Sequence, residues 1–338
     1  MYSHGLQTLP SGSKNFDAVT AQVSALADLG LPDQVLGLQN LRFNDHANVE
    51  VPDVGEFALT DWSRRQLATI LGVRWDKWFQ TAKTEEIADE VNRRLRRSDF
   101  EMKIRLARHS GSPDEHGDDG VLRAFLGPTY TPIDDAQVFD SLRANMGSEL
   151  ASAKFVRTAV TDRSSHFAGV AGDPVDLGAP GKPDWIYPGF MIRNSEVGFT
   201  ALTIDVFIFR LVCTNGLMIQ TEGKRLLYRQ HRPIEAGKLA DLLGEAFSKL
   251  AASSSMAVKQ LGRARTEPLE EPEKVIEVLV RSARLPAGLV RSVTDAYHEE
   301  PNSTRFGVVQ ALTRAARALP PDSRFELEQL AGRFLAAA

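Results

Sequence analysis

At 338 residues the chain is long enough for about two domains, and 43% hydrophobic with 25% charged residues is the composition of an ordinary soluble globular protein. The single cysteine excludes an internal disulfide, so we expect a reducing, cytoplasmic setting. No apolar run approaches the roughly 18 to 20 residues of a membrane span, and the N-terminal stretch lacks the charged-then-apolar order of a signal peptide.

The net charge of −4 is unevenly distributed along the chain. Residues 1–59 carry two basic and seven acidic side chains, whereas residues 60–110 carry twelve basic and eight acidic ones. The stretch 188–232 carries six basic and three acidic side chains. A basic middle behind an acidic arm suits a polyanionic partner, although charge also varies along chains that bind no polyanion.

Residues 1–59 are punctuated by Ser, Gly, Pro and Asn, which are residues of turns and loops. We interpret them as an acidic N-terminal arm and not as a separate folded domain. Within the arm we expect a short helix at Phe16–Leu29 and short strands at Leu41–Phe43 and Asn48–Val51.

Two helices are expected next. The first begins at Thr60 or Asp61, either of which can cap it, and ends at Gly72. The second begins at Thr84, which we expect to be its cap, and ends in an arginine cluster. That cluster consists of Arg93, Arg94, Arg96 and Arg97. It either complements the negative end of the helix dipole or contacts phosphate groups.

The middle of the chain has the pattern of strands. Residues 103–126 are expected to form a hairpin with a long tip, and Lys154–Thr161 a further strand. The segment 163–188 is rich in Gly and Pro and matches neither a phosphate-binding loop nor a dinucleotide fingerprint. We interpret it as a mobile excursion between strands.

The longest β-type run follows this excursion. Phe199–Val212 is β-branched and aromatic with two apolar faces, which indicates a central strand covered on both sides. Phe190–Asn194 is expected to be its neighbour. Asn215-Gly216 is a hairpin-turn signal, after which Leu217–Ile219 is expected to return as the partner strand.

Beyond residue 233 the apolar spacing becomes helical and prolines punctuate it. The helices are expected at Ile234–Leu261, Glu271–Arg284, Ala287–His298, Phe306–Leu319 and Phe325–Leu335. The order of elements predicts an α+β fold, an antiparallel sheet with packed helices followed by an α-helical C-terminal region. We divide the chain into the arm (1–59), an α+β core (60–232) and the helical region (233–338).

Four pieces of this sequence carry a family resemblance. They are GVLRAFLGPTYTPIDDAQVF at 120–139, MIRNSEVGFTALTI at 191–204, FRLVCTNGL at 209–217 and STRFGVVQALT at 303–313. The chain thereby resembles, over about residues 55–315, the phage/plasmid-like family known as domain of unknown function 932. The family pattern has a serine and an arginine where this chain has Gly127 and Thr129. The resemblance implies a curved antiparallel sheet and a setting in DNA metabolism, similar to the single-strand annealing proteins of phages, and it implies no catalytic residue.

A dense set of basic residues with an aromatic one lies in and after the longest strand. Its members are Arg193, Arg210, Lys224, Arg225, Tyr228, Arg229 and Arg232. Basic side chains on a sheet neutralise phosphates and flat rings stack on bases, so this set, with the arginine cluster of the second helix, predicts a groove for a nucleic-acid strand. The alternative is that these arginines are paired internally with Glu196, Asp205 or Glu222.

The sequence therefore predicts a nucleic-acid-binding protein, with single-stranded DNA favoured as partner, that is a homo-oligomer and does not insert into a membrane. The alternative is a protein-interaction or regulatory module that uses the C-terminal helices. A third hypothesis, an enzyme, would place its site near Asn194, Glu196 and Asn215. No spacing indicates a catalytic triad, a metal site or a cofactor, so no catalytic residue, metal or cofactor is expected.

Overall fold

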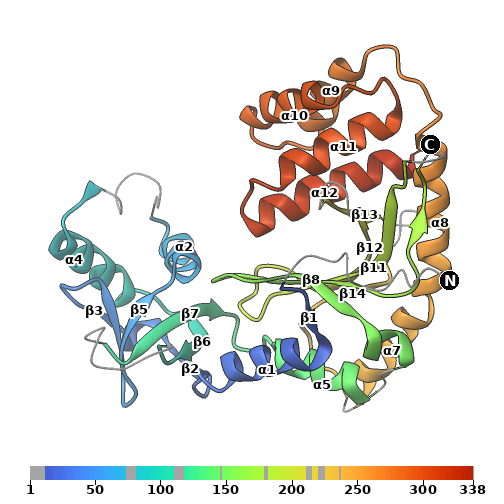
Figure 1. The fold of residues 1–338 in the computed structure, drawn as a ribbon. Coiled ribbons are helices and arrows are strands. Elements are labelled where there is room, and N and C mark those ends of the chain that lie inside the picture. Colours follow the sequence, from blue (N-terminus) through green and yellow to red (C-terminus); the bar gives the residue numbers. More distant parts are fainter. Residues whose placement is uncertain are drawn as a thin grey trace.

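The computed structural model describes residues 12–73, 81–109, 118–144, 147–178, 182–210, 215–219, 225–235 and 237–337. Two sheets and their helices make up the fold (Figure 1). A smaller sheet with α2 (Asp61–Ile70) and α4 (Thr84–Leu95) lies to one side, and a larger sheet with most of the other helices lies to the other. The predicted α+β class is confirmed.

The larger sheet is antiparallel throughout. Its strands are β1 (Lys14–Asn15), β8 (Lys154–Val160), β9 (Ser165–Val170), β10 (Val175–Asp176), β11 (Trp185–Asn194), β12 (Leu202–Arg210), β13 (Asn215–Ile219) and β14 (Leu227–Arg229). The main order is β1-β8-β9-β11-β12-β13, with β10 paired to β11 and β14 paired to β12. The two longest strands, β11 and β12, are therefore neighbours at its centre.

The smaller sheet contains six strands in the order β2-β6-β7-β5-β4-β3. Their bounds are β2 (Gln34–Gly37), β3 (Arg42–Phe43), β4 (Asn48–Val51), β5 (Gly55–Leu59), β6 (Glu101–Ala107) and β7 (Gly120–Leu126). β6 and β7 form the expected hairpin, and a short 3-10 helix, η2 (Leu38–Asn40), follows β2. The core of this unit packs α2 and α4 against the sheet. The division that we made from the sequence between residues 59 and 60 falls inside this smaller unit, because β5 pairs directly with β7.

The central position predicted for the longest β-type run is confirmed by β12, whose first eight residues are all buried. The side chains of its even-numbered residues, from Leu202 to Ile208, lie in the main core. That core fills the space between one face of the sheet and the helices that cover it. Phe207 and Phe209 point to the opposite face, where Phe325 of the last helix packs on them. Alternation along an extended strand produces this two-sided burial.

The helices associated with the larger sheet come from distant parts of the chain. They are α1 (Phe16–Ala27), α5 (Asp135–Ala144), α6 (Ser148–Ser152), α7 (Lys238–Ser248), α8 (Leu250–Ala264), α9 (Pro272–Ser282), α10 (Gly288–Glu299), α11 (Arg305–Ala316) and α12 (Pro321–Ala336). The expected α-helical C-terminal region is present (Figure 1). The single helix expected at Ile234–Leu261 is in fact two, α7 and α8, which meet at Lys249. No helix among the described residues has the length and apolar character needed to cross a bilayer.

Three local predictions were wrong. The segment 163–188 is not an excursion, because it contains β9 and the start of β11, and every residue of β9 is buried. Asn215 and Gly216 are not the hairpin turn, since they pair in register with Arg210 and Phe209 as the first residues of β13. Thr84 is the first residue of α4, and the capping position belongs to Lys83.

Candidate functional site

Helix α2 of the smaller unit docks on two turns of the larger sheet. Trp62 donates a hydrogen bond of 2.8 Å from its indole N–H to the carbonyl of Val197, and its ring contacts Phe199 edge-on at 5.1 Å. The backbone N–H of Trp62 donates to Asp162 in the turn between β8 and β9. An aromatic ring with a satisfied N–H gives both area and direction, so this contact fixes the two units relative to each other.

Arg105 on β6 is the ionic centre of the junction between the units. Its guanidinium lies 3.0 Å from Asp33 and 2.7 Å from Asp134, and it donates to the carbonyl of Glu196 at 2.8 Å. Burial acts to lower the pKa of Arg105, but Asp134 and Asp33 outweigh it, so the pKa is raised. One side chain thus holds three segments that are far apart in the sequence.

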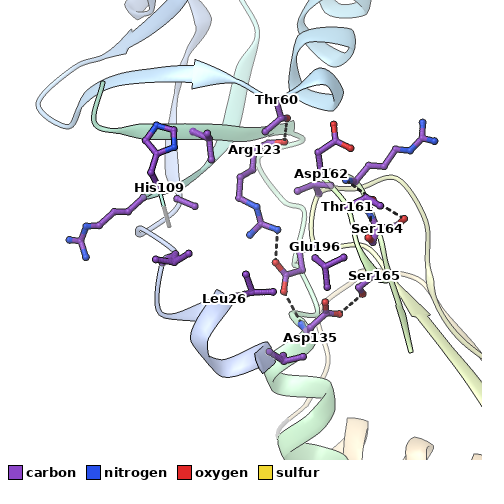
Figure 2. Close-up of a pocket in the computed structure, with 18 residues that line it drawn as sticks. Leu26, Thr60, His109, Arg123, Asp135, Thr161, Asp162, Ser164, Ser165 and Glu196 are labelled. Atoms are coloured by element: carbon purple, nitrogen blue, oxygen red, sulfur yellow. Dashed lines mark hydrogen bonds and ion pairs between the residues drawn. The ribbon is translucent and has the colours of Figure 1, made fainter. Parts of the chain in front are cut away.

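A chain of polar contacts continues from Glu196 into the larger sheet (Figure 2). Glu196 pairs with Arg123 at 2.8 Å and accepts from the backbone N–H of Asp135 at 2.9 Å. The Asp135 carboxylate in turn accepts hydrogen bonds of 2.8 Å from Ser165 and from the side-chain amide of Asn194. Burial, and then the nearby Glu196 charge, raise the pKa of Asp135 to about 7.

A cavity of about 320 Å³ lies beside this network, between α1, the ends of β6 and β7, and the β8–β9 turn (Figure 2). Leu26, Val160 and Val197 contribute apolar lining, whereas Asp135, Arg123 and Glu196 contribute charges. A buried carboxyl whose pKa is near neutrality is able to take up or release a proton at physiological pH. Among the described residues no group of three or more His, Cys, Asp or Glu gathers as a metal site requires.

Arg193 is the first member of the predicted basic set. It belongs to a row of directly opposed residues on the face of the larger sheet that α12 covers. Arg193 on β11 stands opposite His166 on β9 and Thr203 on β12, and Thr203 stands opposite Tyr228 on β14. Directly opposed residues of antiparallel strands project to the same face, so these four side chains share one side. The first three are buried, whereas 61% of Tyr228 is exposed.

Arg193 is held by an ion pair of 3.0 Å with Asp322 at the start of α12. Its guanidinium lies 4.5 Å from the Phe325 ring centroid and 5.5 Å from that of Phe199. Arg163 reaches the same site from the β8–β9 turn, 2.7 Å from Asp322 and 4.6 Å from the Phe199 centroid. Burial opposes the charge of Asp322, but hydrogen bonds from His166, Ser164, Arg193 and Arg163 place its pKa well below the ordinary range.

A second carboxylate on α12 also serves two arginines. Glu328 is fully buried and accepts two hydrogen bonds of 2.7 Å from Arg157 on β8. It also accepts one of 2.8 Å from Arg324. Together with the Asp322 site, four guanidinium groups therefore share two carboxylates in the first half of α12. Glu326 adds a third negative charge near Arg193, so the arginines of this set still outnumber the carboxylates.

Other members of the predicted set are divided between the two faces. Arg225 lies 3.7 Å from Asp205, which shares the face of Arg193 because it is two residues beyond Thr203. Arg210 and Arg229 stand opposite Ile186 and Leu202, which belong to the main core on the other face.

The two residues on the other face have internal partners. Arg210 pairs with Asp184 at 2.7 Å and with Gln310 at 2.8 Å, and Arg229 donates to the carbonyl of Pro233. Arg232 is exposed, and Lys224 lies outside the described residues.

The arginine cluster of α4 belongs to the smaller unit. Arg93 and Arg94 both pair with Glu90 at 2.6 Å, and Arg94 also donates to the carbonyl of Leu71. Arg96 and Arg97 are exposed at the end of the helix. The structure thus does not bring this cluster into the row that contains Arg193.

Comparison with protein families gives one result. The family model described as Domain of unknown function (DUF932) matches residues 124–314, which is more than half of the chain. The chain belongs to this family. It matches none of the curated proteins and none of the solved structures with which it was compared.

The DUF932 match covers the larger-sheet side of the junction, whereas Trp62, Arg105 and Arg123 of the smaller unit precede it. It includes Asp135, Asn194 and Glu196, and it ends before α12 supplies Asp322 and Glu328. Of the residues named for an enzyme, Asn194 and Glu196 meet at the junction. Asn215 pairs with Arg210, seven residues along β12 from Thr203, or roughly 23 Å at 3.3 Å per residue.

The acidic residues that organise both sites carry no motif that marks them in the sequence. Asp134 and Asp135 were assigned no functional role, Asp322 precedes the expected helix Phe325–Leu335, and Glu328 lies within that helix. One available signal was the acidic pair Asp322 and Glu328 on a helix whose other inward residues are apolar, since buried carboxylates require partners.

Proposed function

We propose that this DUF932 protein binds single-stranded DNA at the end of the larger sheet where α12 begins. The observation that carries the proposal is the coincidence of surplus positive charge with an exposed ring on one face of the sheet. Cations neutralise the phosphates of a strand, and a ring such as Tyr228 stacks on a base regardless of sequence.

The path proposed for the DNA strand runs over the basic and aromatic side chains that remain accessible to solvent. Tyr228 is 61% exposed, and the side chains of Arg163, Arg225 and Arg324 are exposed by 31%, 23% and 21%. Arg193 is buried and stacked between Phe199 and Phe325, so its part is to support the surface. A strand would contact Tyr228 and Arg225 on one side of α12 and Arg163 on the other.

Fluorescence anisotropy with labelled single-stranded DNA tests this proposal at two salt concentrations. Neutralisation of three phosphates predicts that affinity falls about 20-fold between 50 and 200 mM salt. Tyr228→Ala is expected to weaken binding about 5- to 150-fold, which corresponds to the roughly 1 to 3 kcal/mol of one base–ring stack. Tyr228→Phe retains the ring and should bind like the parent protein.

Phe100→Ala is the matched control, because Phe100 is 60% exposed but precedes β6 on the smaller sheet. We expect it to leave the affinity unchanged. Equal binding by Tyr228→Ala and the parent protein, or no binding by the parent at 50 mM salt, would contradict the proposal. Unlabelled duplex of the same length, added as competitor, should displace the strand only weakly.

Self-association and a protein-binding role for the C-terminal helices are further predictions from the sequence. Val278 on α9 is 60% exposed, so this helix offers an apolar contact on the outer side of the helical region. Light scattering during size-exclusion chromatography tests self-association against the chain mass of 37.2 kDa. A single species of that mass at micromolar concentration would contradict it.

A further inference from the structure

A second, smaller pocket lies at the start of α12. Its volume is about 210 Å³, equivalent to about seven waters at 30 Å³ each, which is room for a tetrahedral oxyanion. The residues that line it are Arg157, Ala159, His166, Leu319, Pro321 and Arg324. Two of these described lining residues are arginines and none is acidic. The pocket therefore presents positive charge to whatever enters it.

The shared carboxylate of Glu328 does not bond to all the N–H donors of the two arginines. Arg157 donates from both terminal nitrogens to Glu328, whereas Arg324 donates only from Nε. The terminal nitrogens of Arg324 have no hydrogen-bond partner among the residues that the structure describes. A guanidinium group with idle donors beside a second cation is suited to bind an anion.

The crowding of like charges supports this reading. Burial lowers the pKa of Arg324, and the positive charges of Arg157 and Arg317 lower it further, against the opposing effect of Glu328. The neighbouring Asp322 does not line the pocket, and its carboxylate is already bonded to Arg163, Arg193 and His166. An added anion would relieve repulsion that the protein's own carboxylates leave uncompensated.

Two further features favour an anion at this place. The pocket contains Pro321 and Arg324 from the first turn of α12, a helix of 16 residues whose capping residue, Pro320, makes no side-chain hydrogen bond. The positive end of the helix dipole therefore adds to the arginine charges. Burial lowers the pKa of His166, so this lining residue is neutral near pH 7 and the arginines carry the charge.

We propose that this pocket is a phosphate-binding site in which Arg157 and Arg324 hold the phosphate group together. The site stands on its own contacts and does not depend on the binding of single-stranded DNA. Its phosphate comes either from a free phosphate compound or from the terminal phosphate of a nucleic-acid strand, and the experiment below separates these sources.

Isothermal titration with inorganic phosphate, at constant ionic strength and with chloride as the reference anion, tests the site. Arg324→Gln removes the idle donors and should weaken phosphate binding at least tenfold. Arg333→Gln is the matched control on the same helix, since the Arg333 side chain is exposed and, within the described part of the chain, bonds only to Gln329. It should bind phosphate within twofold of the parent protein.

Arg324→Gln also removes one partner of the buried Glu328, so a second variant leaves every ion pair in place. Ala159→Met fills the pocket from β8, and it should abolish phosphate binding while circular dichroism and the melting temperature stay near those of the parent. Phosphate binding by Ala159→Met at the parent affinity, or no heat from the parent protein at millimolar phosphate, would overturn the proposal.

The source of the phosphate is tested with one oligonucleotide made with either a 5′-phosphate or a 5′-hydroxyl. Tighter binding of the phosphorylated strand, lost on addition of inorganic phosphate, assigns the site to strand ends. Equal binding of both strands assigns it to a free phosphate compound. Tyr228→Ala should retain phosphate binding, so failure of the DNA proposal and failure of this one give different results.

Discussion

Glu196 joins the two sheets through its two carboxylate oxygens. Its Oε1 accepts a hydrogen bond of 2.9 Å from the backbone N–H of Asp135, and its Oε2 lies 2.8 Å from the Arg123 guanidinium on β7. The turn after β11 is thereby tied to the first turn of α5 and to the smaller sheet. Asp135 is buried behind this link, and its carboxyl group resists ionisation.

The first prediction concerns the pH dependence of stability. The pKa of Asp135 is about 7 in the folded protein and 3.8 in an ordinary environment, so the folded state retains a proton that the unfolded state releases between these values. Its contribution to the free energy of unfolding therefore falls as pH rises from about 4 to 7, by at most about 1.4 kcal/mol per pH unit. Asp135→Asn removes this slope, which urea denaturation at several pH values measures.

Two buried histidines change the stability in the opposite direction over part of this pH range. Burial lowers the pKa of His166, and that of His231 to about 4, so their contribution to stability rises with pH. Both histidines are present in the parent protein and in Asp135→Asn, and the difference between the two curves isolates Asp135. A difference that does not change between pH 4 and 7 would show that Asp135 titrates normally.

The second prediction concerns Arg105. Its side chain is only 12% exposed and pairs with Asp33 and Asp134, so Arg105→Met leaves carboxylates without their partner. Asp33 and Asp134 keep 24% and 40% of their side chains exposed to water, so the expected loss in the free energy of unfolding is about 1.5 to 3 kcal/mol. Arg42→Met is the control, since Arg42 is 75% exposed and 3.9 Å from Glu50, and it should change the free energy of unfolding by less than about 0.5 kcal/mol. Similar losses for the two variants would contradict the role of Arg105.

Local pattern was sufficient to predict β12 but not β9. Both faces of β12 bear apolar side chains, so its sequence alone indicates a central strand. In β9 the residues Ser165, His166 and Gly169 are typical of loops. Their burial depends on distant partners, since His166 contacts Asp322, Ser165 contacts Asp135, and the Phe190 ring fills the space over Gly169. A prediction from the local sequence cannot identify those partners, because they lie far along the chain.

The same limit applies to the basic residues of the candidate site. The sequence located Arg193 and Tyr228 in one stretch, and the structure places them in one cross-strand row. It did not reveal that Asp322, 129 positions after Arg193, would neutralise that arginine. Nor did it reveal that Arg210 would face the other side, because the face of a residue depends on strand register.

The third prediction follows from the position of Arg210. Its guanidinium shares Asp184 with Arg265 on the helix-covered face, so Arg210→Gln should destabilise the fold without touching the proposed DNA surface. Because Arg265 still pairs with Asp184 in this variant, we expect a loss of about 1.5 to 3 kcal/mol in the free energy of unfolding, as for one hydrogen bond to a charged group. The affinity of the folded variant for single-stranded DNA should match that of the parent protein. A tenfold weaker affinity would place Arg210 in the DNA interface instead.

The fourth prediction compares the two basic clusters by equal changes of charge. Lys224→Glu combined with Arg225→Glu should abolish retention of single-stranded DNA at about 100 mM salt, because Arg225 lies on the face that carries Tyr228. Arg96→Glu combined with Arg97→Glu changes the net charge by the same amount just after the end of α4, in the smaller unit. It should weaken binding only slightly, through screened long-range repulsion.

Gel shifts with both double variants, each checked for an unchanged melting temperature, decide between the clusters. The check matters because a glutamate at position 225 would face the buried Asp205. If the first double variant still retains single-stranded DNA and the second does not, the DNA surface lies at the end of α4. Equal loss in both would mean that net charge, and not the row on the larger sheet, governs binding.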